Sequence, residues 1–157
     1  MNRDTVIEIL RNSSRMLADA FGEEFVGMIL FGSWARGEAE ADSDVDVLVV
    51  FRSFGGFEAR SKVYSIIAEH VKMPLTLIDA RLGEITSEDY ELTPLMLNIL
   101  YDGIVIWDRD GVLKDFVEKG RKLIEGAKLV RYKVPDGKYG WKRADGKPIA
   151  LCDVNSG

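Results

Sequence analysis

The sequence predicts an α/β (α+β) fold in which helices pack on a mixed β-sheet. Amphipathic helical patterns alternate with short apolar strand patterns through most of the 157 residues. One predicted strand, 44–51, is apolar on both faces beyond its acidic start, which is typical of a central strand covered on both sides. A composition of 46% hydrophobic and 30% charged residues is that of an ordinary soluble globular protein.

The first elements are a helix and a strand. Residues 4–21 carry apolar side chains at helical spacing. We expect Asp4 to cap this helix and Gly22 to end it. Residues 25–31 form an apolar run suited to a strand, which ends abruptly at Gly32.

The middle of the chain predicts a strand, a helix and another strand. Residues 44–51 are rich in β-branched side chains, as strands are. Gly55 and Gly56 mark a turn before a helix over 57–71. The third strand is expected at 74–80.

The next elements are a helix over 87–100, in one or two pieces, and a short strand over 103–107. Thr93 and Pro94 resemble an N-cap followed by proline at the first helical position. A last amphipathic helix is expected over 111–127.

The tail from residue 128 is different, because turn signals replace periodic patterns. We expect one folded domain over 1–127 and an arm or hairpin over 128–157, docked by Trp141 and not a separate domain. The tail is basic, which favours a solvated surface and leaves nucleic-acid binding open. The basic residues are Lys128, Arg131, Lys133, Lys138, Lys142, Arg143 and Lys147.

Composition excludes several kinds of site. A single cysteine, Cys152, allows no internal disulfide and no cysteine-rich zinc site. A single histidine, His70, excludes multi-histidine metal sites and is expected near a helix end. Net charge is −5, and no signal peptide or membrane-spanning segment is evident, so we expect a cytoplasmic protein. Aromatic residues in the tail are compatible with a homodimer.

The informative stretch runs from Phe31 to Val50. Gly32 and Ser33 follow an apolar strand, where glycine permits a tight turn and free N–H groups with a serine hydroxyl can hold phosphate. Asp44 and Asp46 lie two residues apart on an extended segment, so their carboxylates share a face and suit Mg²⁺. The dozen positions between the two features allow both to converge on one triphosphate.

This pattern resembles the signature of the nucleotidyltransferase superfamily with the polymerase-β-like fold, in which Gly-Ser and a later glycine precede Asp-x-Asp on a strand. Its order is matched here by Gly32, Ser33, Gly37, Asp44 and Asp46. The small chain is similar to the minimal nucleotidyltransferases, which often pair with a helical partner of the HEPN type. Residues 1–127 would then be the nucleotidyltransferase domain.

The resemblance implies transfer of a nucleoside monophosphate, AMP from ATP in the first instance, to a hydroxyl of a protein or small molecule. Gly32, Ser33 and Arg36 would hold phosphate, and the two aspartates would hold two Mg²⁺ ions. Arg36 could instead be an exposed arginine of a helix with no role in phosphate binding. Trp34 could stack on a base, but a packing role is favoured.

The family places a third carboxylate on the next strand, and two positions compete for it here. Asp79 is the available acid, and we assign it with Asp44 and Asp46 as catalytic and metal-binding. Thr76 is the alternative occupant, and a strand points the two in opposite directions. With Thr76 in the place of the acid, the chain would instead be an antitoxin-like subunit that binds nucleotide and a helical partner.

Overall fold

The computed structural model describes residues 1–87 and 92–146 and contains the expected mixed sheet. The strand order is β3–β2–β1–β4, with β2 parallel to β3 and β1 antiparallel to both of its neighbours. All four strands lie close to the ranges predicted from the sequence. They are β1 (Phe25–Phe31), β2 (Val45–Phe51), β3 (Leu75–Arg81) and β4 (Ile104–Asp108).

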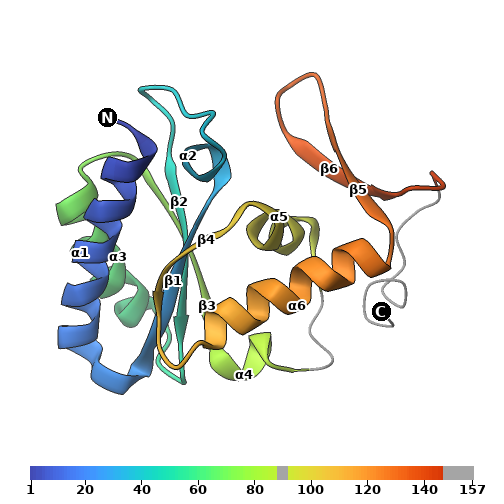
Figure 1. Cartoon of the computed structure of the whole chain (residues 1–157). Coiled ribbons are helices and arrows are strands. Elements are labelled where there is room, and N and C mark those ends of the chain that lie inside the picture. Colours follow the sequence, from blue (N-terminus) through green and yellow to red (C-terminus); the bar gives the residue numbers. More distant parts are fainter. Residues whose placement is uncertain (88–91, 147–157) are drawn as a thin grey trace.

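Helices cover both faces of this sheet (Figure 1). The helices α1 (Arg3–Phe21) and α3 (Phe57–Val71) pack on one face, and α5 (Pro94–Asp102) and α6 (Val112–Gly126) pack on the other. Every β2 residue except Asp46 is buried, so this strand is central, as predicted. Three short helices complete this part of the chain: η1 (Gly22–Glu24), α2 (Gly32–Arg36) and α4 (Leu82–Ile85).

Two helix starts differ from the prediction. Asp4 is not the cap of α1, because the side chain of Asn2 accepts the backbone N–H of Thr5. Asp4 therefore lies inside the first turn, where an acid is equally typical. The helix expected over 87–100 is wrong at its start, since α5 begins at Pro94 with Thr93 as its cap, as predicted for that pair. Residues 88–91 lie outside the described chain.

A cap substitution tests this correction. Asn2→Ala is expected to lower the free energy of unfolding by about 1 kcal/mol, because the N–H of Thr5 loses its acceptor. Asp4→Ala, two residues further along the chain, should cost less, since it removes only a favourable charge near the helix terminus. Urea unfolding of the two variants checks the order, and a larger loss for Asp4→Ala would restore the original assignment.

The tail forms a hairpin of β5 (Leu129–Lys133) and β6 (Tyr139–Arg143), one of the two arrangements expected. Trp141 docks it, with its side chain buried and its Nε1 donating to Asn98 Oδ1 of α5 at 2.9 Å. The backbone N–H of Ala144 returns to the carbonyl of Lys128, so the hairpin is closed at its base. The hairpin therefore packs on the body through one face.

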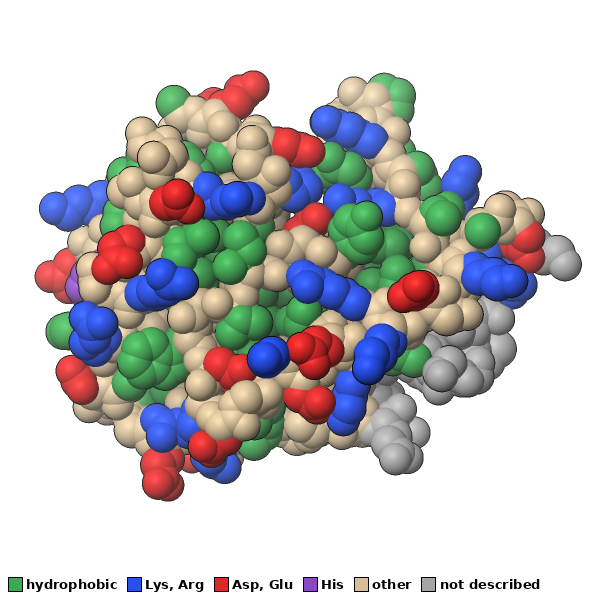
Figure 2. All heavy atoms as spheres, viewed as in Figure 1, with side chains coloured by type: hydrophobic (Ala, Val, Ile, Leu, Met, Phe, Trp, Pro, Cys, Tyr) green, Lys and Arg blue, Asp and Glu red, His purple; other side chains and the backbone are tan. Residues whose placement is uncertain are grey.

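Charge is spread over the surface with both signs mixed, on the face seen in Figure 2. Most described basic side chains of the hairpin are exposed, which fits a solvated surface. Arg131 is the most buried of them, because its side chain is 13% exposed and paired with Asp102, and Arg143 is partly exposed and paired with Asp145. Lys147 lies outside the described residues. Among the helices of the described residues, none combines the length and the apolar character that spanning a bilayer requires.

Candidate active site

The turn after β1 brings the backbone against an acidic side chain. Gly32 has φ +76°, a conformation that glycine adopts without strain. A Cβ at this position would collide with the carboxylate of Asp46, so only glycine fits without displacing that side chain. The register agrees, because Phe31 at the end of β1 pairs with Asp46 on β2. The Gly-Ser turn and the acid pair thus meet at one end of the sheet.

Asp44 and Asp46 lie at the mouth of β2. Asp46 is half-buried on the strand, and Asp44 is exposed just before it. Neither carboxylate forms an ion pair with a basic side chain of the part of the chain described. A pair of oxygen-rich acids without a cationic partner suits a hard divalent cation, which would supply the missing positive charge.

Burial raises the pKa of Asp46 to about 6, and the negative charge of Asp44 adds to this effect. The neighbouring Thr76 hydroxyl and the positive charge of Arg36 act in the opposite direction. The carboxylate is therefore held in an unfavourable environment at neutral pH, as expected for a group that awaits a bound cation.

Thr76 lies beside the acid pair on the neighbouring strand. It is the register partner of Asp46 across the parallel β2–β3 pair. Its hydroxyl donates to Asp44 Oδ2 at 3.2 Å. Of the two candidates for the third position, Thr76 is the one that the fold brings next to Asp44 and Asp46.

Asp79 lies elsewhere, three residues further along β3 and paired in register with Val49. Its carboxylate accepts from Arg60 at 2.6 Å and from Arg81 at 2.8 Å. The two guanidinium groups hold its pKa below the usual range, although burial alone would raise it. Among the described residues, no three His, Cys, Asp or Glu side chains gather closely enough to hold a metal ion. Asp79 is thus not brought together with the acid pair.

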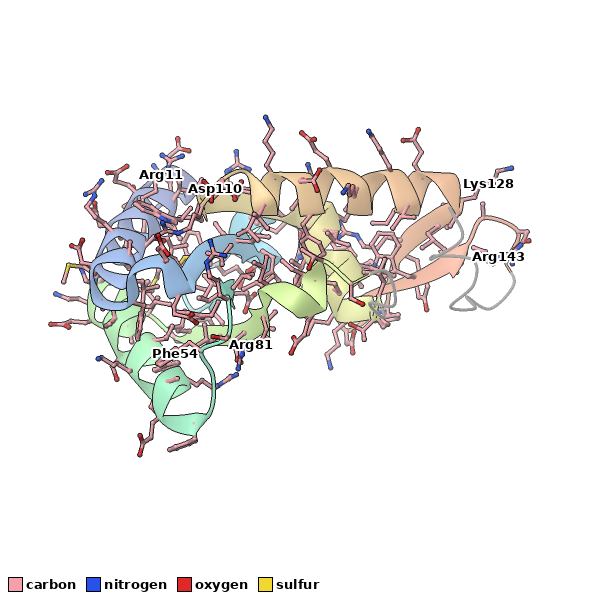
Figure 3. The ribbon with its side chains drawn as sticks, turned by 90° about the horizontal axis from the view of Figure 1, so that it is seen from below. Arg11, Phe54, Arg81, Asp110, Lys128 and Arg143 are labelled. Atoms are coloured by element: carbon pink, nitrogen blue, oxygen red, sulfur yellow. The ribbon has the colours of Figure 1, made fainter. Side chains whose placement is uncertain are left out.

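Arg81, which pairs with Asp79, lies at the opposite end of the sheet from the Gly32 turn (Figure 1). The helix α2 lies at the upper end in Figure 1, whereas α4, which begins directly after Arg81, lies at the lower end. In Figure 3 the labelled Arg81 lies far from Lys128 and Arg143, which mark the base of the hairpin. The ion pair of Asp79 with Arg60 joins α3 to β3.

Arg36 ends α2 and is not the exposed helix arginine that the sequence allowed, since its side chain is only 18% exposed. Its Nε donates to Glu38 at 3.0 Å and its Nη1 donates to Asp102 at 3.1 Å. Tyr139 of the hairpin covers it, with the ring centroid 4.6 Å from Cζ. The guanidinium is therefore fixed in direction close to the acid pair.

The two remaining residues of the turn have different surroundings. Trp34 is buried in the core below the turn, and its Nε1 donates to the carbonyl of Ser43 at 3.3 Å, so it packs as favoured. Ser33 is partly exposed, and its hydroxyl has no hydrogen bond within the described chain. The first N–H groups of α2 also lack partners inside the helix. The turn can therefore offer several donors to an anion.

Comparison with known proteins identifies the family. The nucleotidyltransferase domain family matches residues 14–105, which are more than half of the chain. The match includes Gly32, Asp44 and Asp46. This chain belongs to the nucleotidyltransferase domain family. It is a transferase, as the resemblance of its Gly-Ser and Asp-x-Asp elements predicted.

Two curated relatives come from Methanocaldococcus jannaschii. "Putative protein adenylyltransferase MJ1305" is 28% identical over 150 residues, which cover 92% of this nucleotidyltransferase and 99% of the relative. "Putative protein adenylyltransferase MJ0141" is 29% identical over 65 residues, which cover 41% and 66%. A solved structure described as "Crystal structure of the toxin-antitoxin with AMP-PNP" has 18% identity and a TM-score of 0.52, covering 73% of this chain and 86% of that one. The structural likeness supports the fold.

Sequence reasoning missed the residues around Arg36. Asp102 at the end of α5 pairs with Arg36 across 66 positions of sequence, and Tyr139 of the hairpin covers Arg36. Arg131 of the hairpin binds the same Asp102 carboxylate. No local pattern marks such partners. The available signal lay in the tail, whose basic residues were interpreted as solvated surface and whose aromatic residues were interpreted as a docking group, Trp141, and as compatible with a homodimer.

Proposed function

We propose that this nucleotidyltransferase moves AMP from ATP to a hydroxyl group of a protein and releases pyrophosphate. The observation that carries the proposal is the close approach of Gly32 to Asp46, which joins a phosphate-binding turn to an acid pair. The name of the full-length relative, a protein adenylyltransferase, supports both the nucleotide and the class of acceptor.

Each residue at the site has a proposed task. The backbone N–H groups after Gly32 and the Ser33 hydroxyl would hold the β- or γ-phosphate. Arg36 would neutralise phosphate charge, because a fixed guanidinium offers directed donors. Asp44 and Asp46 would hold two Mg²⁺ ions. When bound, the ions would offset the charge of the triphosphate and align the attacking oxygen with the leaving pyrophosphate.

The proposed acceptor is a small helical protein of the HEPN type that forms a complex with this chain. The toxin–antitoxin description of the similar structure supports this partner. Label transfer tests the whole proposal. The chain, its co-expressed genomic neighbour and Mg²⁺ are incubated with ATP labelled on the α-phosphate.

We expect label on the neighbour's product, and none when the γ-phosphate carries the label instead. EDTA should abolish the transfer, since it removes the proposed metal ions. Label on neither protein with α-labelled ATP would refute adenylyl transfer between them, and label that persists in EDTA would refute the metal dependence.

A second candidate function is nucleotide binding with little catalysis, and the position of Thr76 favours it. The residue beside Asp46 on β3 carries a hydroxyl in place of a carboxylate. A hydroxyl cannot act as a general base at neutral pH. The chain would then act through its complex with the partner, in the manner of an antitoxin-like subunit.

Substitution at Thr76 separates the two candidates. Thr76→Asp is expected to raise the rate of label transfer by about 10²-fold or more, because it adds a base and a metal-binding oxygen beside Asp46. Asp79→Asn is the matched control, and the transfer rate should stay close to that of the wild type because Asp79 contacts Arg60 and Arg81. If Asp79→Asn lowers the transfer rate under conditions in which the variant is still fully folded, Asp79 belongs to the site after all.

A further inference from the structure

The C-terminal hairpin reaches the edge of the proposed site through an arginine and a tyrosine, Arg131 and Tyr139. Arg131 of β5 donates to Asp102 Oδ2 at 2.6 Å, and Arg36 donates to the same oxygen at 3.1 Å. The Asp102 side chain is 5% exposed, so both cations pair with a carboxylate that is almost wholly buried. The two arginines are thus tied to one anchor.

Aromatic rings of the hairpin and of α5 enclose these two cations. The Cζ of Arg131 lies 4.4 Å from the ring centroid of Tyr101 and 4.2 Å from that of Tyr139. The same Tyr139 ring lies 4.6 Å from the Cζ of Arg36. Contacts of this kind between guanidinium groups and rings are worth more when desolvated, and the Arg36 and Arg131 side chains are only 18% and 13% exposed. Tyr139 therefore fixes both guanidinium planes at once.

A second polar path joins the same residues. The Tyr139 hydroxyl donates to Glu38 at 3.1 Å, and Glu38 accepts from Arg36 at 3.0 Å. The hydrogen bond from Arg36 lowers the pKa of Glu38, and the Tyr139 hydroxyl adds to the effect. Glu38 lies two residues after the end of α2, so the hairpin holds both the guanidinium and the segment that follows this helix.

The network leaves Arg36 free to bind a further anion. A guanidinium has five N–H donors, and Arg36 uses one on Nε and one on Nη1 for described partners. The remaining donors belong to a group whose direction is already set by Asp102 and Tyr139. A group fixed in advance loses less freedom when it binds phosphate, which strengthens binding.

We propose that the hairpin is a positioning element of the nucleotide site, in which Tyr139 and Arg131 orient Arg36 toward the triphosphate. The inference rests on the proposed function. It extends the site beyond residues 14–105, which the family shares, to a segment at 129–143. Tyr139 and Arg131 are positioning residues, because they act through Arg36.

Nucleotide affinity tests the proposal with a matched pair of tyrosines. Tyr139→Ala removes the ring over Arg36, and Tyr132→Ala removes a ring from the opposite face of the same hairpin. Calorimetry with Mg²⁺ and α,β-methylene ATP measures the Kd of each variant. We expect about a tenfold rise for Tyr139→Ala, the loss of one charge-assisted contact, and less than about twofold for Tyr132→Ala.

Three further comparisons separate positioning from a general structural role. Tyr139→Phe keeps the ring and should restore most of the affinity. In an Arg36→Met background, Tyr139→Ala should weaken binding no further, because the residue through which it acts is absent. Arg131→Lys, which retains the charge and loses the planar stacking group, should weaken binding several-fold. Thermal unfolding of every variant is measured alongside.

The outcomes are distinct for the two proposals. Wild-type affinity in Tyr139→Ala, or an equal loss for Tyr132→Ala, would overturn the positioning role. An undiminished effect of Tyr139→Ala in the Arg36→Met background would overturn it as well. A wild-type chain that binds the nucleotide analogue and transfers no label would refute the proposed function, and the binding measurements would still test the hairpin.

Discussion

Asp46→Asn is expected to stabilise the nucleotide-free protein and to abolish adenylyl transfer. The carboxylate is half-buried beside Asp44 and lacks a basic partner in an ion pair among the described residues. Asparagine has nearly the same shape and carries no charge to desolvate. We expect an increase of roughly 1–2 kcal/mol in the free energy of unfolding at pH 7, less than the full pKa shift implies because solvent reaches the side chain. The transfer rate should fall by on the order of 10²–10³-fold or more.

The stability effect has a defined pH dependence. The pKa of Asp46 is about 6 in the folded protein and 3.8 when unperturbed. A raised pKa in the folded state means that stability is lost as pH rises through that window. The advantage of Asp46→Asn over the wild type should therefore be small at pH 4 and grow until about pH 6, as chemical unfolding at several pH values can measure.

Two controls accompany this variant. Asp44→Asn removes an exposed carboxylate, so its effect on stability should be smaller while transfer is still impaired. Adding Mg²⁺ should raise the unfolding temperature of the wild type and leave that of Asp46→Asn nearly unchanged. An Asp46→Asn protein that is less stable than the wild type at pH 7 would contradict the view of this acid as a cation-binding group.

Gly32→Ala is expected to remove transfer with only a moderate loss of stability. The new Cβ would collide with the Asp46 carboxylate, which can rotate away because it is the end of a side chain. Stability should fall by about 1–2 kcal/mol for a residue forced to positive φ. Transfer should fall by at least about 10²-fold, because the acid is displaced from its position beside the turn.

Gly37→Ala is the matched control for this substitution. Gly37 has the same φ of +76°, and a Cβ there would meet nothing within 4 Å. The backbone strain is therefore similar, whereas Asp46 stays in place. Rate and unfolding measurements on both variants separate strain from collision. Equal transfer rates in the two variants would show that the approach of Gly32 to Asp46 does not matter for the reaction.

Much of the fold follows from local patterns that the sequence displays directly. The period of the apolar residues located the four strands and the helices α1, α3 and α6 to within a residue or so. The two-sided burial of β2 was evident from its unbroken apolar run. The cap of α1 was missed because Asn2 and Asp4 are both common at helix starts, and only geometry separates them.

Only the part of the candidate site that lies within one short stretch of sequence could be predicted. Gly32, Asp44 and Asp46 belong to one stretch of chain, and a short connection brings them together. The choice between Thr76 and Asp79 depends on the register between β2 and β3, which no spacing in one strand reveals. The partners of Arg36 come from a helix end and a distant hairpin, so their approach depends on tertiary packing.

A crystal structure with Mn²⁺ and α,β-methylene ATP tests the central claim most directly, because this analogue resists cleavage at the α–β bridge and manganese is visible by anomalous scattering. The account predicts Mn²⁺ bound to the carboxylates of both Asp44 and Asp46, with the triphosphate against the backbone that follows Gly32 and the side chain of Arg36. A triphosphate bound away from Gly32, or metal held by Asp79 without Asp46, would contradict it.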